Sequence, residues 1–215
     1  MSSKMTCAAL LAVLATSTAR ADPSREDAGA VFTMSDDATG NAVLAFARSS
    51  DGKLHVAGAF PTGGAGSGGG EPVLGSQGAL ALSSDGRFLL AVNAGSDDVS
   101  SFRIDGAQLT LVGRAPSGGV FPVSVTEHDG LVYVLNAGGD GNISGLLLDE
   151  HGALAPLPDS TRPLGSAEAG AAQVAFDRSG RALAVTEKAV QEIVLYAVDR
   201  EGLASAPHPV PSSGA

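Results

Sequence analysis

Short apolar segments separated by glycine turns follow one another along almost the whole chain. Apolar residues, chiefly valine, leucine and phenylalanine, fill runs such as 88–92, 131–135 and 183–185. Between the runs stand pairs of a polar residue and a glycine, which favour the positive φ of a hairpin turn. These pairs lie at residues 51–52, 85–86, 105–106, 129–130, 151–152, 179–180 and 201–202. The pattern predicts an all-β chain built from successive β-hairpins.

The hairpins form part of a longer internal repeat. Residues 77–93 align with residues 173–187 with one gap, and residues 123–136 form a third copy. A fourth, partial copy covers residues 31–34 and 43–46. A repeat of about 40 to 50 residues with four strands is typical of a β-propeller blade, which buries its faces only against its neighbours. We therefore expect an all-β protein, a propeller of four-stranded antiparallel blades with about four blades present.

Three regions are expected along the chain. Residues 1–21 combine Lys4, a short apolar run and small residues ending at Ala21, which together indicate a secretory signal peptide; the run is too short for a membrane span. Residues 22–30 should be a short linker. Residues 31–215 should form the propeller, with units at about 31–64, 77–119, 121–165 and 171–214, the first with three strands. We therefore expect a periplasmic or secreted protein.

Composition and charge exclude several kinds of partner. The chain has 29 glycines and 11 prolines but only 4% aromatic residues, which argues against a helical protein. Its formal net charge of −10 would repel nucleic acid and anionic membranes. Cys7, the single cysteine, lies in the expected signal peptide, so the mature chain has no thiol for a disulfide, a metal or nucleophilic catalysis. We expect no cofactor and no metal.

Strand direction places the unusual polar residues on one side of the disc. If the hairpin turns join the first strand to the second and the third to the fourth, the start of the first strand and the end of the second lie on the opposite side. We call that side the polar face, and the side with the hairpin turns the turn face. The polar face collects Gln77 and Gln173 at strand starts, Asn93, Asn136 and Glu187-Lys188 at strand ends, and Asp36, Asp37, Asp97, Asp98 and Asp140 in loops.

Several of these segments resemble a known family. Residues 83–96 and 131–145, which contain Asn-Ala-Gly-Gly-Asp at 136–140, and Val-Thr-Glu-Lys at 185–188 are similar to the lactonase family of seven-bladed β-propellers. That family includes bacterial 6-phosphogluconolactonase-like proteins and fungal carboxymuconate cyclases. The resemblance implies a hydrolase that opens a sugar lactone or a related lactone, and a chain that is a partial propeller.

This chain departs from the family in two respects. Family members carry about seven blades, whereas four units are visible in this chain. Lactonases of the family often have a Pro-His pair where the first strand of a blade begins, and this chain has Gly78 or Ala172 there. The second departure weakens the expectation of hydrolysis.

Glu187 and Lys188 are the candidates for catalysis. They follow a run that is typical of a buried strand, and consecutive strand residues point to opposite sides, so only one of them can face the propeller axis. A carboxylate could activate water, and an ammonium group could stabilise the oxyanion of an opening lactone. Gln77, Asn93, Asn136 and Gln173 are the predicted substrate-binding residues. A solvent-exposed charge pair at a strand end is the competing interpretation.

Other motifs are weaker. Residues 63–70 contain a G-x-G-x-x-G pattern, but no helix is expected after it, so we interpret the segment as a flexible connection between blades. None of the four histidines lies within four residues of another, and His128 and His151 fall at turns, where solvent exposure is expected. The aspartate-containing loops lack the spacing of a calcium loop and are expected to be solvated loop tips.

Two functions remain open. The first is a lactonase-like hydrolase acting on a small lactone or another carbohydrate-derived ligand. The alternative is a non-catalytic exported propeller that binds a ligand or a protein partner through its loops. The first unit lacks its first strand, and residues 205–215 contain three prolines, which suit a closing strand poorly. Open blade faces at both ends therefore predict self-association.

Overall fold

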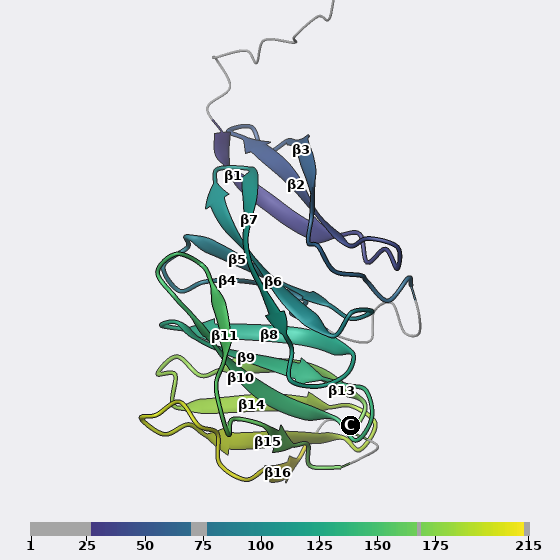
Figure 1. Cartoon of the computed structure of the whole chain (residues 1–215), viewed down its shortest axis with the longest axis vertical. Helices are drawn as coiled ribbons and strands as arrows, with labels where there is room; N and C mark the ends of the chain where they lie inside the picture. The colour runs from purple at the N-terminus through teal and green to yellow at the C-terminus, as the bar shows by residue number, and fades with distance from the viewer. Residues whose placement is uncertain (1–26, 70–76, 167–168, 213–215) are drawn as a thin grey trace, which may run out of the picture.

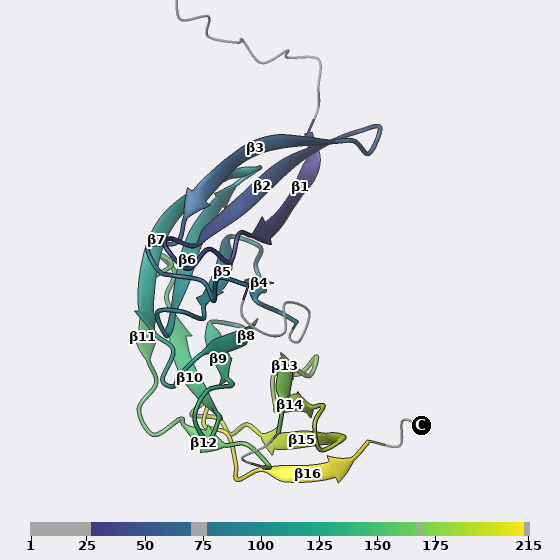
Figure 2. The ribbon, with the colours of Figure 1, turned by 90° about the vertical axis from the view of Figure 1, so that its right-hand side faces the viewer.

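The computed structural model describes residues 27–69, 77–166 and 169–212, and the expected signal peptide lies outside these ranges. Four antiparallel sheets follow one another as the blades of an open arc (Figures 1 and 2). The predicted all-β partial propeller is confirmed. No helix of the described ranges is long and apolar enough to cross a membrane.

The blades are numbered 1 to 4 in chain order. Blade 1 contains β1 (Asp27–Met34), β2 (Ala42–Ser49) and β3 (Leu54–Pro61). Blade 2 contains β4 (Leu80–Leu82), β5 (Phe88–Asn93), β6 (Asp98–Asp105) and β7 (Gln108–Pro116). Blade 3 contains β8 (Pro122–His128), β9 (Leu131–Asn136), β10 (Asn142–Leu148), β11 (Leu154–Pro156) and β12 (Arg162–Pro163). Blade 4 contains β13 (Ala171–Phe176), β14 (Ala182–Glu187), β15 (Glu192–Ala197) and β16 (His208–Pro211).

Two details differ from the expected boundaries. Strand β1 begins at Asp27, so the last residues of the expected linker belong to blade 1. The outer strand of blade 3 is split into β11 and β12, which pair with opposite ends of β10. Ser160 lies between them, and its Oγ accepts the Gly145 N–H at 2.9 Å, so a side chain takes the place of a backbone partner for β10.

Alternating apolar positions hold neighbouring blades together. Val43 and Ala45 of β2 are completely buried toward blade 2, and Leu135 of blade 3 packs in one cluster with Val185 of blade 4. The hydroxyl of Tyr133 donates to the Gly202 carbonyl at 2.8 Å and accepts the Ala204 N–H at 2.9 Å, both in blade 4. The core is therefore a series of layers between blades, as a propeller requires.

Three inner strands, β4, β8 and β13, lie along the concave side of the arc (Figure 2). Val125 N–H donates to the Gly78 carbonyl at 2.8 Å, which joins β8 to the start of β4. Along β8, Ser124 accepts the Val174 N–H, and Thr126 accepts the Phe176 N–H. The inner strands therefore run in the same direction. The ends of β5, β9 and β14 consequently share one side of the arc, which confirms the predicted polar face.

The glycine-rich segment after β3 is not a flexible connection over its described part, residues 63–69. Asp36 accepts both the backbone N–H and the hydroxyl of Ser67, at 2.7 Å and 2.5 Å. Gly66 N–H donates to the Asp37 carbonyl at 2.8 Å, and a Cβ on Gly66 would lie 2.3 Å from the backbone of Asp36. The prediction was wrong because these glycines permit close backbone contact between loops.

Both end sheets expose apolar side chains. In blade 1, Val31, Phe46 and Val56 form one cross-strand row on the side away from blade 2, and Val56 is 80% exposed. In blade 4, Ile193 and Leu195 are also exposed. Self-association through these faces stays a prediction.

Candidate functional site at the polar face

Asn93 is completely buried at the end of β5, and its side chain is fully engaged by the protein. Its amide nitrogen donates to the Asp98 Oδ1 at 2.6 Å and to the Ser100 Oγ at 2.9 Å. Its Oδ1 accepts a hydrogen bond from the amide of Asn41 at 2.9 Å. A Cβ on Gly64, in the connection from blade 1, would lie 2.6 Å from the Asn93 side chain. Asn93 therefore fixes the connection between blades 1 and 2.

Asn136 occupies the equivalent place in blade 3 and is also completely buried. Its amide nitrogen donates to the Asn142 Oδ1 at 2.9 Å and to the Ser117 carbonyl at 3.2 Å. Gly119, in the connection from blade 2, lies directly over it. The two asparagines thus have the contacts of positioning residues, and their predicted contact with substrate stays a prediction.

Glu187 takes this place in blade 4, with only 1% of its surface exposed. Its Oε1 accepts the Gly165 N–H at 2.8 Å, and its Oε2 has no hydrogen-bond partner in the described part of the chain. Burial raises the pKa of the Glu187 carboxyl above its ordinary value, the Gly165 N–H opposes this shift, and the negative charge of Glu192 adds to it. The carboxyl therefore keeps a proton to higher pH than an ordinary glutamate does.

Lys188 is exposed, in contrast to Glu187. Its backbone N–H donates to the Gly170 carbonyl at 3.3 Å. Lys188 borders a shallow pocket of about 400 Å³, which is also lined by Thr186, Glu187, Gln191, Glu192, Ile193 and Ser212. Glu187 shares its side of the sheet with Leu183 and Val185, which pack toward blade 3, and the pocket lies where β14 ends and β15 begins. Glu187 and Lys188 therefore border the same pocket, but only Lys188 is exposed, and their joint role in catalysis stays a prediction.

Gln77 and Gln173 are brought together although blade 3 separates their blades in sequence. The Gln77 N–H donates to the Ala172 carbonyl at 2.9 Å. A Cβ on Gly78 would lie 3.9 Å from the Gln173 Cγ and 2.7 Å from the Ser124 hydroxyl oxygen. Gln77 is exposed and Gln173 is half-buried. The starts of the inner strands of blades 2 to 4 therefore converge, and these two glutamines are the candidate ligand contacts that solvent can reach.

The loop aspartates are only in part the solvated tips that the sequence predicts. Asp37 and Asp140 are exposed as expected. Asp98 is buried beside Asn93, and Asp97 accepts the Phe121 N–H at 2.7 Å, as Asp36 accepts Ser67. Asp36, Asp97 and Asp98 thus hold loops in place through hydrogen bonds. The prediction that they are solvated loop tips was wrong for these three. Within the described ranges no group of three His, Cys, Asp or Glu residues could hold a metal.

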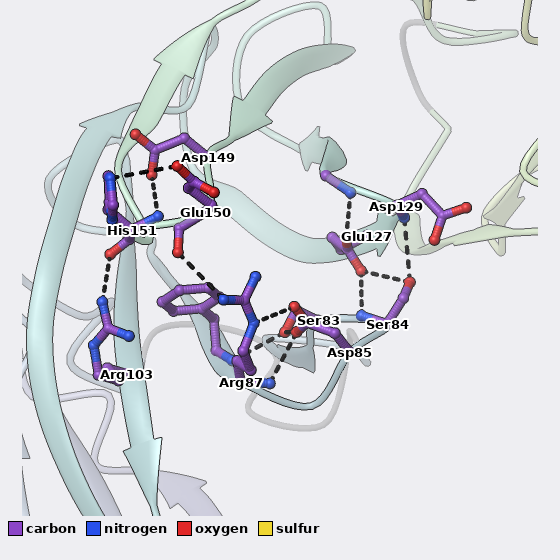
Figure 3. A network of polar contacts seen from close by, with 12 residues as sticks. Ser83, Ser84, Asp85, Arg87, Arg103, Glu127, Asp129, Asp149, Glu150 and His151 are labelled. Carbon is purple, nitrogen blue, oxygen red and sulfur yellow. Dashed lines mark hydrogen bonds and ion pairs between the residues drawn. The ribbon is translucent and has the colours of Figure 1, made fainter.

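The turn face carries a second polar network, which the sequence analysis did not single out (Figure 3). Glu127 accepts the Ser84 N–H and hydroxyl at 2.6 Å and 2.8 Å, and the Gly130 N–H at 2.6 Å. Arg87 pairs with Asp85 at 2.5 Å. The network borders a pocket of about 250 Å³ between blades 2 and 3. Its hydrogen bonds link neighbouring turns. The position of Glu127 at the end of β8, just before the turn at 129–130, was its only sequence signal.

The two histidines of the turn face, His128 and His151, differ in their exposure to solvent. His151 is largely exposed, as expected. His128 is not a solvated turn residue: its ring contacts Phe176, with 5.9 Å between ring centroids, and a Cβ on Gly180 would lie 2.5 Å from its Nδ1. The expectation failed because the turn of blade 4 packs over the ring, which sequence position alone does not indicate.

Comparison with known proteins agrees with this architecture. The family profile "Lactonase, 7-bladed beta-propeller" matches residues 39–161, more than half of the chain. The chain belongs to the lactonase family of seven-bladed β-propellers. The match to the lactonase family covers Asn93 and Asn136 and ends before Glu187 and Lys188. No curated protein gives a significant match to the chain.

Solved structures share the fold of this lactonase-family chain. A protein from Lactobacillus plantarum has a TM-score of 0.63 at 18% identity, with 85% of this chain and 54% of that chain covered. A candidate 6-phosphogluconolactonase from Bacteroides fragilis has a TM-score of 0.59 at 16% identity, with coverage of 89% and 58%. Another from Bacteroides uniformis has a TM-score of 0.56 at 21% identity, with coverage of 80% and 51%. The lactonase-family chain thus spans a little more than half the length of these structures.

Proposed function

We propose that this chain forms part of an exported propeller that hydrolyses a sugar lactone or a related lactone at its polar face. Family membership supports the reaction class. The single observation that carries the location is the convergence of inner strands, which brings Gln77 and Gln173 together through the hydrogen bond from Gln77 to Ala172. Small-molecule sites are typically concave and contain a few convergent polar groups.

Lactone hydrolysis sets clear demands on the site. Water adds to the ring carbonyl, a tetrahedral oxyanion forms, the ring C–O bond breaks, and the leaving alkoxide takes a proton. Amide groups of Gln77 and Gln173 suit the hydroxyl groups of a sugar, and the ammonium group of Lys188 suits the oxyanion. The carboxyl of Glu187 takes part only if the connection around Gly165 moves, because that connection covers it.

The burial of Glu187 favours a second candidate, a propeller that binds a carbohydrate-derived ligand without turnover. In that case the same surface holds the ligand, and no carboxyl reaches it. The two functions predict different results with the same variants, because hydrolysis requires a proton-transfer group and binding does not.

The test uses the exported full-length protein and a panel of aldonolactones with and without a phosphate group. Base uptake at constant pH measures turnover, and titration calorimetry with each lactone and its open acid measures binding. We expect Gln173→Ala and Lys188→Ala to lower kcat/KM at least tenfold and Glu187→Gln to abolish turnover, while His151→Ala on the turn face has the wild-type rate. Equal rates in all four variants would refute the polar-face site. Binding that Gln173→Ala weakens, without turnover by the wild type, would establish the non-catalytic alternative.

A further inference from the structure

Blades 2 and 3 share one arrangement of side-chain hydrogen bonds at the polar face, which we call the side-chain lock. In each, a buried asparagine at the end of the second strand donates to a side-chain oxygen of the residue opposite it on the third strand: Asn93 to Asp98, and Asn136 to Asn142. The same amide donates to a serine two residues further along the third strand. That serine in turn donates to a carbonyl of the connection between blades, Ser100 to Thr62 and Ser144 to Ser117. In both blades the side-chain amide of the asparagine donates the hydrogen bonds to the third strand.

Blade 4 has the same backbone arrangement with different side chains. Glu187 replaces the asparagine, Glu192 lies directly opposite it, and Val194 replaces the serine. Residues directly opposite on antiparallel strands have Cβ atoms about 5 Å apart. Glu187 and Glu192 also share the side of the sheet that faces blade 3, as Val185 and Val194 do. Two carboxyl groups therefore occupy the paired positions at which the other blades have a donor and an acceptor.

The groups around Glu187 and Glu192 do not supply a hydrogen-bond donor to Oε2 of Glu187. The Gly165 N–H is used by Oε1 of Glu187, and the Tyr196 hydroxyl donates to the Pro163 carbonyl at 2.9 Å. Burial and the charge of Glu187 both raise the pKa of Tyr196, so this phenol stays protonated. Lys188 is the charged residue next to Glu187 in sequence. Oε2 of Glu187 remains without a partner among the described residues, as does the Oδ1 of Asn136 in blade 3, but only Oε2 can itself take up a proton.

We propose that one proton, shared between the carboxyl groups of Glu187 and Glu192, completes the lock of blade 4 and makes the junction of blades 3 and 4 sensitive to pH. The Glu187 carboxylate takes up one proton from water on Oε2, and the resulting O–H donates to the Glu192 carboxylate. No other bond changes. The protonated carboxyl then has the role that an amide N–H has in blades 2 and 3. Loss of the proton leaves two negative charges on directly opposite residues of β14 and β15 and loosens the connection at 164–166.

The sign of the effect follows from the direction of the pKa shift. A group whose pKa is raised by folding stabilises the protein fully below its unfolded pKa, and this contribution is lost as the pH rises through its folded pKa. The junction should therefore be tight in mild acid and weaker in alkali. A salt bridge in this place would show the opposite dependence.

The experiment compares thermal unfolding of the full-length protein between pH 5 and pH 8 at constant ionic strength. Glu187→Gln places a permanent amide donor opposite Glu192, and Glu150→Gln, which removes an exposed acid on the turn face, is the matched control. We expect the Tm of the wild type and of Glu150→Gln to fall by about 3 °C or more over this range. The Glu187→Gln variant should keep its Tm to within about 1 °C. If the Tm of Glu187→Gln falls as much as the Tm of Glu150→Gln over this pH range, the proposal is overturned.

A second measurement on the wild type covers the case in which Glu187→Gln does not fold. Hydrogen exchange at the Gly165 amide, corrected for the intrinsic effect of pH, should accelerate at least tenfold from pH 5 to pH 8, whereas exchange at the Gly130 amide, bound to Glu127, should not. Equal behaviour of the two amides would refute the shared proton. Protection of Gly165 by millimolar calcium at pH 8, with no effect of pH alone, would also refute it and would assign the pair to a cation.

Discussion

The side-chain amide of Asn41 donates a 2.9 Å hydrogen bond to the Oδ1 of Asn93, and both residues are buried. Asn41 precedes the second strand of blade 1, and Asn93 ends the second strand of blade 2. Together with Asp98 and Ser100, they form a continuous polar core beneath the connection between the two blades. Asn93 thus stabilises the junction between blades 1 and 2, independently of any further role of the polar face.

Removal of the Asn93 amide should strongly destabilise the chain. Asn93→Ala leaves the Asn41 amide with only a 3.4 Å hydrogen bond to the Val92 carbonyl and removes the amide donor to the Asp98 Oδ1. An unsatisfied buried group costs about 1–3 kcal/mol. We expect a loss of about 2–4 kcal/mol in the free energy of unfolding, measured by urea denaturation. Asp140→Ala, in an exposed loop, is the control and should change the free energy by less than about 0.5 kcal/mol. Equal stability of the two variants would show that the polar core is dispensable.

A single methyl group at Gly66 should disrupt the anchored loop after β3. The Cβ of Gly66→Ala would lie 2.3 Å from the backbone of Asp36, so the two loops have to separate. Gly40→Ala is a matched control, because no atom lies within 4 Å of its Cβ position. We expect Gly66→Ala to lower the free energy of unfolding by about 2 kcal/mol or more, and the control to leave it almost unchanged. Fast limited proteolysis within residues 63–69 of the variant alone would locate the damage there.

Acid should weaken the hairpin turns in a defined pH range. The pKa values of Asp51, Asp85 and Asp177 are lowered to about 2 by hydrogen bonds within their own turns. The donor with the largest effect is the side chain of Lys53 for Asp51, of Ser83 for Asp85 and of Ser179 for Asp177. A lowered pKa contributes stability that is complete above the ordinary value of 3.8 and is lost as the pH falls toward 2. Side-chain carboxyl NMR should show titration midpoints near 2 for these three aspartates. Midpoints near 3.8 would contradict the turn hydrogen bonds.

The open end sheets should make the chain from residue 22 onward self-associate. Val56 at one end and Leu195 at the other present apolar surface with no blade over it. Light scattering coupled to chromatography should give a mass that rises with concentration, and Val56→Glu should reduce that rise. Val120→Glu changes an exposed valine outside the end sheets and should have no effect. A monomer at all concentrations would contradict the prediction.

The strands and their order were predictable because their signals are local. A polar residue with glycine, as at 85–86 or 129–130, permits the turn, and alternating apolar residues on both sides permit a strand, so the blades follow from short segments. The direction of the strands then determined that Asn93, Asn136 and Glu187 share a face. Burial does not follow from the same signals. Gly64, Gly119 and Gly165 lie over these three residues, and each belongs to a connection distant in sequence.

The sequence by itself determined the blade repeat, the polar face and the candidates on it. Only the tertiary structure decided that Asn93 and Glu187 lie inside the protein, that Gln77 meets Gln173, and that His128 packs under the turn at Gly180. The physical reason is that the accessibility of a side chain depends on which neighbouring blade covers it. A repeat specifies the blade, and packing between blades specifies which polar groups solvent can reach.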